Sequence, residues 1–558
     1  MSVNLDTRSR RQSLGRKEVD GQSLKRLVEA GLTWLRTNQQ IVNALNVFPV
    51  PDGDTGTNMV LTMQSAYKEI EDSADRNFGK MAHAVAHGAL MGARGNSGVI
   101  LSQIWRGFAR AVDNNPTLDV ISTIQALNAA RDTAYKGVVR PVEGTILTVI
   151  KDIAAEAEEA DHHASDLIEL LANIVAEADL SVRRTPDLLP VLKEAGVVDS
   201  GGKGLFYILE GMLRFIDGLP LDTATSQVVS LSEMAKEHTQ EGVEPGQDYE
   251  VIVDFRPDEP LDLMNFYGEL EEMGTSIQLG EGDGLYRLHI HVPTSKLYSP
   301  IEFTRAMGIV TKVAIENLVD QMNSNENRCN DDVKVAPVEP GQNAVVAVSP
   351  GEGIARVFAS LGANAIVEGG QTMNPSTQEI IHAFEDLPTD KIIILPNNKN
   401  IILTAKAAAE LTVKQVSVIA SCSVPQGLAA MMRLIPDGDF ESVVNEMSEA
   451  LEDVETGEIT VATRSVEIDG VQVEEGQIIA LHNDKLVFAA MSIEGAALGF
   501  LEKAHADQFE LITMFYGSNI TKHEAFHIAD LIRIKYPAQI IEVQEGCQPH
   551  YQFIISVE

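Results

Sequence analysis

Residues 46–59 read Asn46-Val-Phe-Pro-Val-Pro-Asp-Gly-Asp-Thr-Gly-Thr-Asn-Met59. This stretch places two carboxylates, Asp52 and Asp54, one residue apart among prolines, glycines and short hydroxyl or amide side chains. Prolines stiffen the backbone, and glycines let it turn sharply and approach a ligand. Carboxylate and amide oxygens suit Mg²⁺, and exposed N–H groups before a helix suit phosphate. The stretch is therefore either a joint metal and phosphate site or a tight turn whose aspartates cap the next helix.

The length of 558 residues predicts two to four domains, because a single hydrophobic core does not grow to that size. The 44% apolar content indicates globular structure. No apolar run reaches the roughly 18 residues that a membrane-spanning helix needs. The polar N-terminus lacks the apolar core of a secretory signal, and residues 1–20 are expected to be a flexible tail. Three widely spaced cysteines without a CxxC pair fit a reduced, cytoplasmic setting.

The chain is strongly acidic. Its 81 acidic and 43 basic residues give a formal net charge of −38. The phosphates of a nucleic acid or of an anionic membrane would be repelled, which argues against both as general partners. For the same reason, a site for ATP has to neutralise charge locally, most simply with Mg²⁺.

The hydrophobic pattern divides the chain into segments. Apolar residues at three- and four-residue spacing predict an all-α domain over residues 21–218. A Thr-, Ser- and Gly-rich linker follows at 219–246, and alternating patterns predict a small α+β domain over 247–323. After a second linker at 324–342, strands alternate with helices from 343 onward, which favours a parallel, doubly wound sheet. This last region, 343–558, is β-rich toward its end and is expected to divide near 436–458.

Two further loops of the helical region are candidate ligand sites. In Arg94-Gly-Asn-Ser-Gly98, Ser97 is either a phosphate contact at a helix N-terminus or simply the N-cap of that helix. Asp199-Ser-Gly-Gly-Lys-Gly204 resembles a P-loop, but position 202 is Gly where Lys is required, and no strand precedes it. We reject the P-loop interpretation. A glycine turn that admits a nucleotide base and an ordinary helix–helix turn remain as alternatives.

Paired histidines are weaker candidates. His83 and His87 lie four residues apart in an alanine-rich helix, where packing is a better explanation than metal binding. His289 and His291 alternate on one strand, so both face one side and are candidate Zn²⁺ ligands, provided that another ligand joins them. The loops 369–377 and 421–427 follow predicted strands, where α/β sheets bind ligands or partners. Both loops can equally be plain turns.

Taken together, these motifs resemble a known family. The 46–59 stretch with Asn43 before it closely resembles the signature of the ATP-binding subunit of bacterial fatty acid kinases, whose N-terminal domain is similar to the nucleotide-binding (DhaL) subunit of dihydroxyacetone kinase. Residues 94–103, 140–147, 198–205, 369–377 and 546–558 match in order. The resemblance implies an N-terminal DhaL-like barrel of helices, an α+β middle domain and a C-terminal α/β domain of the DegV type.

The same resemblance implies a function. ATP and Mg²⁺ are its cofactors, and the acceptor is a fatty acid held by a separate DegV-like fatty-acid-binding protein, which becomes an acyl phosphate for phospholipid synthesis. It also implies a homodimer. The Mg²⁺ ligands by position are Asn46, Asp52 and Asp54. The expected phosphate and nucleoside contacts are Thr55, Gly56, Thr57, Asn58, Asn96, Ser97, Gly98, Thr145, Asp199, Ser200, Gly201 and Gly202.

The resemblance also bears on the paired histidines of the middle domain. His289 and His291 match a histidine pair of the family, in which a Cys of the preceding strand completes a metal site. The corresponding strand here has Glu250 as its nearest match and no Cys. Two other functions remain open for the whole chain, namely a dihydroxyacetone-type kinase that acts on a small polyol and a nucleotide-sensing scaffold without catalytic activity. The intact Asp52, Asp54 and Ser97 favour a catalyst over the scaffold.

Overall fold

A computed structural model describes residues 18–47, 53–138, 140–160, 166–221, 229–230, 249–257, 261, 266, 269–270, 273–282, 285–317, 333–371, 373–462, 466–468, 471–474 and 476–558. The residues fall into two compact units. One unit joins residues 1–223 to 333–558, and the other contains residues 224–332. Asp52 of the opening motif lies outside the described residues. In the described part of the chain, no helix is both long and apolar enough to cross a membrane.

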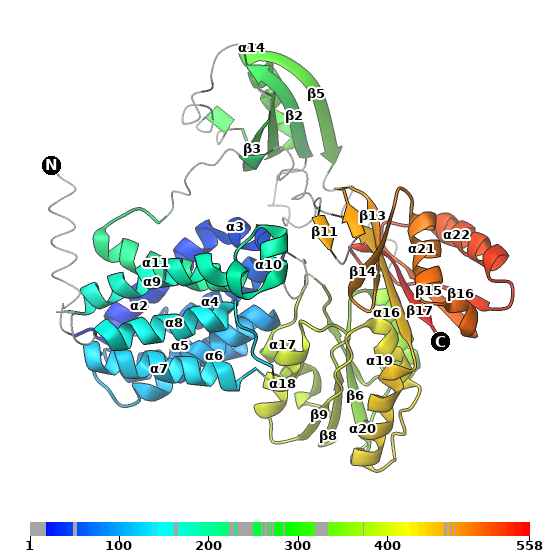
Figure 1. The fold of residues 1–558 in the computed structure, drawn as a ribbon, viewed down its shortest axis with the longest axis horizontal. Coiled ribbons are helices and arrows are strands. Elements are labelled where there is room, and N and C mark those ends of the chain that lie inside the picture. Colours follow the sequence, from blue (N-terminus) through cyan, green and yellow to red (C-terminus); the bar gives the residue numbers. More distant parts are fainter. Residues whose placement is uncertain are drawn as a thin grey trace. The chain divides into compact units, whose positions relative to one another are not determined.

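The N-terminal region is all-α, as the sequence predicts. Successive helices pack against one another, and the last packs against the first, which closes a ring around one apolar core (Figure 1). The helices are α2 (Gly21–Thr37), α3 (Gln39–Ala44), α4 (Thr55–Lys68), α5 (Phe78–Met91), α6 (Gly95–Ala111), α7 (Val120–Lys136), α8 (Ile146–Ala160), α9 (Leu167–Leu188), α10 (Pro190–Ala195) and α11 (Ser200–Asp217).

Local chemistry explains where many of these helices begin. Asp20, Asn77 and Asp119 each accept a backbone N–H of the first turn of α2, α5 and α7, respectively. Asp166 does the same for α9. Such N-caps each stabilise a helix by about 1 kcal/mol. The helix α4 departs from this pattern, and its start belongs to the candidate site described below.

The second unit is an antiparallel sheet with helix α14 (Ser299–Met307). Its strands are β1 (Val229–Ser230), β2 (Tyr249–Pro257), β3 (Thr275–Gly282), β4 (Leu285–Val292) and β5 (Gly308–Asn317), in the order β1-β3-β4-β2-β5. Only the short β1 pairs in parallel. The register of β2 against β4 pairs Glu250 with His291 and Ile252 with His289. The α+β prediction for this part of the chain is confirmed.

The C-terminal region begins with the predicted parallel sheet. Its strands lie in the order β7-β6-β8-β9 and are all parallel: β6 (Asn343–Ser349), β7 (Ala365–Glu368), β8 (Lys391–Leu395) and β9 (Gln415–Val418). Every residue of β6 is buried because separate apolar clusters cover the two faces of the sheet. The helices are α16 (Glu352–Ser360), α17 (Thr377–Glu385), α18 (Ile402–Glu410), α19 (Val424–Met431) and α20 (Phe440–Glu449).

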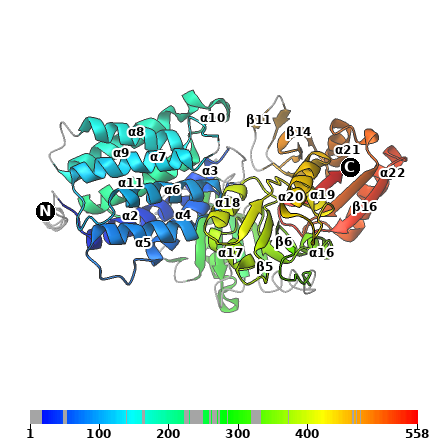
Figure 2. The same ribbon diagram turned by 90° about the horizontal axis from the view of Figure 1, so that it is seen from below.

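A second, mixed sheet completes this region. It has the order β14-β13-β10-β17-β15-β16, and its strands are β10 (Glu455–Val461), β13 (Ile478–His482), β14 (Lys485–Ala490), β15 (Leu511–Tyr516), β16 (Ile540–Glu545) and β17 (Tyr551–Val557). Helices α21 (Ile493–Lys503) and α22 (Lys522–Lys535) pack on it, and β11 (Val466–Ile468) and β12 (Val471–Val473) form a separate hairpin. In both views α17 and α18 lie against the helical ring (Figure 2).

Candidate metal and phosphate site

Helix N-termini converge at one end of the ring. The Ser200 hydroxyl donates to the Thr55 hydroxyl at 3.2 Å, which joins the starts of α11 and α4. A Cβ added to Gly95 at the start of α6 would lie 2.6 Å from the Asn58 side chain of α4. A Cβ added to Gly201 in the first turn of α11 would lie 3.3 Å from the side chain of Ile146, the first residue of α8. The starts of α4, α6, α8 and α11 are thus grouped, and their aligned dipoles favour a bound anion.

Asp54 lies at this end of the ring, but it does not cap α4 with its side chain. The amide oxygen of Asn43 does so instead, because it accepts the N–H groups of Gly56 at 2.7 Å and Thr57 at 3.2 Å. The Asp54 side chain is only 7% exposed. The alternative that Asp54 is merely a helix cap is therefore wrong. A buried carboxylate that the helix does not use is suited to a cation.

Asn43 engages the start of α4 more extensively than the sequence suggests. Its amide nitrogen donates to the Thr57 hydroxyl at 3.1 Å, and Gln39 donates to the same hydroxyl at 3.0 Å. Asn58 donates its backbone N–H to the Asp54 carbonyl within the helix. The amides of Gly56 and Thr57 are thus engaged within the protein. The phosphate contacts expected at residues 55–58 stay predictions, as do the metal roles of Asn46, which is buried, and Asp52.

Ser97 is not an N-cap, contrary to one of its two interpretations. Helix α6 begins at Gly95 with Arg94 in the N-cap position, so Ser97 lies in the first turn and is half-buried. Asn96 donates to the Asn400 side-chain oxygen of the C-terminal region at 3.1 Å. Gly98 packs tightly on α4, since a Cβ there would lie 2.4 Å from the Thr62 hydroxyl. The helix start that carries Ser97 is thus held close to the start of α4.

Asp199 caps α11, and its carboxylate accepts the Gly202 N–H at 2.6 Å. Burial raises the pKa of Asp199 to about 6, and the bonds from the Gly202 and Ile146 amides lower it by less. A Cβ on Gly202 would lie 2.7 Å from Val149. Close packing between helices therefore explains why position 202 is a glycine, which agrees with the interpretation of this segment as a helix–helix turn. Thr145, which directly precedes α8, is buried and donates its hydroxyl to the Val142 carbonyl at 2.7 Å.

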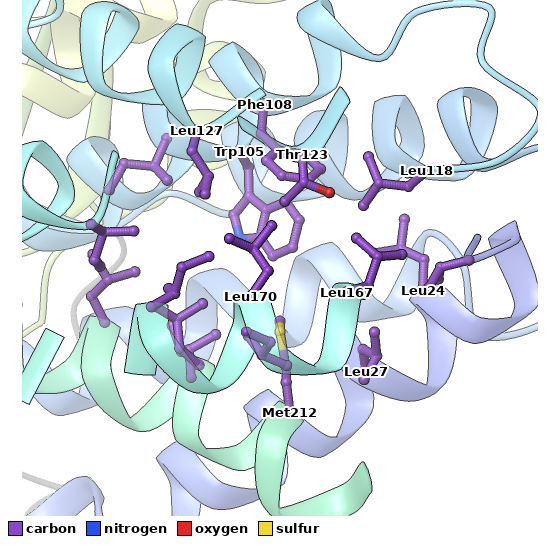
Figure 3. A pocket seen from close by; sticks show the side chains of 18 of the residues that line it. Leu24, Leu27, Trp105, Phe108, Leu118, Thr123, Leu127, Leu167, Leu170 and Met212 are labelled. Atoms are coloured by element: carbon purple, nitrogen blue, oxygen red, sulfur yellow. The ribbon is translucent and has the colours of Figure 1, made fainter. Parts of the chain in front are cut away.

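A cavity among the described residues inside the ring is poorly suited to a nucleotide. It has a volume of about 160 Å³ and is lined by leucine, isoleucine, aromatic and other apolar side chains, with Thr123 as its polar member. Figure 3 shows Leu24, Trp105, Leu170 and Met212 pointing toward one another across it. Burying a charged phosphate among such groups without partners is very costly. A phosphate therefore fits at the end of the ring, where polar groups gather, and not in this cavity.

The middle domain holds a separate cluster of candidate metal ligands. Glu250, His289 and His291 are buried, and one ligand atom from each lies within 4.8 Å of the others. Glu250 Oε1 is 3.7 Å from His289 Nδ1, and the two imidazole ring centres are 5.0 Å apart. Among the residues that the structure describes, this is the cluster of such groups that could hold a metal ion. His83 and His87 instead lie beside different carboxylates, Asp113 and Glu69.

Matches to known protein families extend over nearly the whole chain. Residues 49–214 match the DAK2 domain model, residues 244–325 the middle domain of FakA-like fatty acid kinase proteins, and residues 344–558 the C-terminal domain of the same proteins. Protein YloV of Bacillus subtilis is 37% identical over 557 residues, which are 97% of this chain and 100% of that protein. The chain belongs to the FakA-like fatty acid kinase family. Its N-terminal domain is thus DhaL-like, and the families it matches are those of kinases.

Solved structures resemble separate parts of this family member. The dihydroxyacetone kinase of C. freundii, in complex with AMP-PNP and Mg²⁺, is 16% identical over 34% of this chain and 33% of that one, with a TM-score of 0.28. The Streptococcus pneumoniae fatty acid kinase B3 protein, loaded with linoleic acid, is 15% identical over 33% of this chain and 76% of that one, with a TM-score of 0.25. The C-terminal region has the α/β architecture with a parallel sheet that the sequence predicts.

Two residues at the site escaped the sequence prediction. Asn43 lies in the short helix α3, and no local pattern distinguishes it from a solvent-facing amide. Asn374 belongs to the 369–377 loop, for which the sequence predicts either a ligand or partner contact at the end of a strand or a plain turn. In the structure its amide nitrogen donates to Asp54 Oδ2 at 2.5 Å. The other loop, 421–427, is anchored within its own region, where the Ser421 hydroxyl bonds with the side chain of Asn397.

Proposed function

We propose that this chain is a kinase subunit that transfers the γ-phosphate of ATP to the carboxylate of a fatty acid, which a separate DegV-like protein carries to the site. The observation that supports this most is the state of Asp54. Its buried carboxylate lies where helix N-termini converge, and the Asn43 side chain caps helix α4 in its place. A cation ligand beside several positive helix ends suits a metal–phosphate complex. Membership of the FakA-like fatty acid kinase family supports the same function.

In this proposal each part of the site has a role. Asn46, Asp52 and Asp54 hold Mg²⁺, which when bound neutralises charge on the transferring phosphate. The oxygen-only donor set of an amide and two carboxylates fits a hard cation. Ser97 and the Thr55 and Asn58 side chains bind phosphate oxygens at the positive helix ends, while the Gly56 and Thr57 amides stay bonded to Asn43. The nucleoside is bordered by Thr145 and by the turn that begins α11, Asp199, Ser200, Gly201 and Gly202.

The chemistry asks little else of the protein. A fatty acid carboxylate is already ionised near pH 7, so no general base is required. One carboxylate oxygen forms a bond to the γ-phosphorus while the bond to the β,γ-bridging oxygen breaks, and ADP leaves with that electron pair. Positioning and charge neutralisation then supply the rate enhancement. The Streptococcus pneumoniae fatty acid kinase B3 protein, which was solved loaded with linoleic acid, is an example of a protein that holds a fatty acid.

One experiment separates this proposal from its two alternatives. The purified chain is incubated with labelled ATP and Mg²⁺, with and without a lipid-loaded DegV-like protein. Acyl phosphate that appears only with the loaded carrier is the expected result. Transfer to dihydroxyacetone without the carrier would indicate the polyol kinase instead. ATP binding without transfer to either acceptor would indicate a nucleotide-sensing scaffold.

A second proposal concerns the middle domain. We propose that Glu250, His289 and His291 hold a Zn²⁺ ion, with Glu250 as the carboxylate ligand, because their ligand atoms lie within 4.8 Å of one another on one face of the sheet. Elemental analysis of the purified chain should find bound zinc, and Glu250→Gln should lose it. Zinc retained in full by that variant would exclude Glu250 as a ligand. Homodimerisation is a further part of the proposal and is tested by the mass of the chain in solution.

A further inference from the structure

A residue of the C-terminal region lies at the candidate metal site of the helical ring. Asn374 is separated from Asp54 by 320 positions, yet its Nδ2 donates to Asp54 Oδ2 at 2.5 Å. Its side chain is 2% exposed. A Cβ added to Gly95 would be 3.5 Å from the same nitrogen, so Asn374 also lies close to the start of α6. The 369–377 loop therefore contacts both the carboxylate and one of the converging helix ends.

Arg94 holds this loop in place. Its Nη1 donates to the Asn374 carbonyl at 2.8 Å, and its Nη2 lies 3.1 Å from Glu379 Oε1. The Thr377 N–H donates to the Ala93 carbonyl at 3.2 Å. Glu379 is also part of the capping box of α17 with Ser376, so one carboxylate fixes both the helix start and the guanidinium. Arg94 directly precedes the Gly95–Ala111 helix that carries Ser97. The two regions are thus joined at the residues that border the phosphate site.

The other end of the Asn374 amide points to a missing ligand. The nitrogen has to face the Asp54 carboxylate, because the amide oxygen would be repelled by it. The oxygen, Oδ1, is buried and has no hydrogen-bond partner among the described residues. Buried polar groups are nearly always paired, and an unpaired one calls for a water, an ion or a ligand. An amide oxygen is itself a good donor to Mg²⁺ or to a metal-bound water.

We propose that Asn374 is a positioning residue for the metal ligand Asp54, so that the C-terminal region completes the kinase site. This inference rests on the proposed function. The N–H bond fixes the orientation of the Asp54 carboxylate, as partners of metal-ligating carboxylates commonly do. The unpaired Oδ1 then faces the metal complex that the carboxylate binds. Separation of the C-terminal region from the ring would remove the amide nitrogen and the amide oxygen of Asn374 from the site.

The test measures metal binding and does not depend on an acceptor. The full chain, saturated with a non-hydrolysable ATP analogue, is titrated with Mn²⁺ as a paramagnetic probe for the Mg²⁺ site. Asn374→Ala should weaken Mn²⁺ binding about 10- to 100-fold, the usual effect of losing such a partner. Binding of the analogue without metal should be unchanged. Asn400→Ala is the matched control, since Asn400 meets Asn96 at the same contact between the two regions.

The outcomes distinguish this inference from the function on which it rests. In the expected case Asn400→Ala changes Mn²⁺ affinity by less than about threefold, which assigns the effect of Asn374→Ala to Asp54 rather than to a loosened contact. Equal losses in the two variants would overturn the inference, and so would tighter Mn²⁺ binding in Asn374→Ala, because Asn374 would then obstruct the metal. Asp54→Ala serves as the reference. If it too leaves Mn²⁺ binding intact, the proposed function itself fails.

Discussion

Replacing Asp199 by Asn should remove a pH-dependent penalty from the helical ring. Burial raises the pKa of Asp199 from 3.8 to about 6, so the folded ring disfavours the ionised carboxylate. Below about pH 3 the group is protonated in both states and carries no penalty. Between about pH 4 and 6 the unfolded chain ionises first, and stability is lost as the pH rises. The shift of about 2 units corresponds to about 3 kcal/mol, reached above pH 6.

The assay uses the two tryptophans of the chain, Trp34 and Trp105, which both lie in the core of the ring. Their fluorescence reports urea unfolding of this region alone. The free energy of unfolding of the wild type, minus that of Asp199→Asn, should fall by about 3 kcal/mol between pH 3 and pH 7. Asp199→Asn also places an amide group against backbone N–H donors. The cost of doing so does not depend on pH, so it cancels from the change in this difference between the two pH values. A flat or rising difference would refute burial as the cause of the raised pKa.

Asp119→Asn provides a control of opposite sign. Bonds from Ser122 lower the pKa of Asp119 at the N-cap of α7. A lowered pKa means that Asp119 stabilises the fold above about pH 4 and loses this effect as the pH falls. The same subtraction for Asp119→Asn should therefore rise with pH. If both aspartates gave the same sign, the effect would belong to the general charge of the chain.

Two further predictions concern the contacts that build the site. Asn43→Ala removes the acceptor for the Gly56 and Thr57 amides, so it should lower the free energy of unfolding of the ring by about 1–2 kcal/mol in the same fluorescence assay. An unchanged urea midpoint of unfolding would show that water replaces the cap without cost. Arg94→Lys keeps the charge but loses the planar guanidinium that reaches both Asn374 and Glu379. The Thr377 amide hydrogen should therefore exchange with solvent faster, as measured by mass spectrometry. An unaltered exchange rate of that amide would exclude Arg94 as the residue that holds the 369–377 loop.

The sequence predicts the secondary structure and fold class of this chain well because both depend on local patterns. Three- and four-residue apolar spacing specifies helices such as α2, and apolar runs such as residues 344–348 of β6 specify the parallel sheet. The start of α4 was harder, because a local rule assigns its cap to Asp54, while the observed cap comes from Asn43 in another helix. The contact of Asn374 with Asp54 spans 320 positions, and no pattern within either segment encodes it.

The measurement that tests the central claim most directly is phosphate transfer by an Asp54→Ala variant. The wild-type chain and the variant are supplied with ATP, Mg²⁺ and a fatty-acid-loaded DegV-like carrier, and acyl phosphate is trapped as the hydroxamate. Loss of a metal-ligating carboxylate should cost about 4 kcal/mol of transition-state stabilisation, which is about a 10³-fold slower transfer. Transfer at the wild-type rate by Asp54→Ala, with its fold verified by tryptophan fluorescence, would contradict the assignment of this carboxylate to the kinase site.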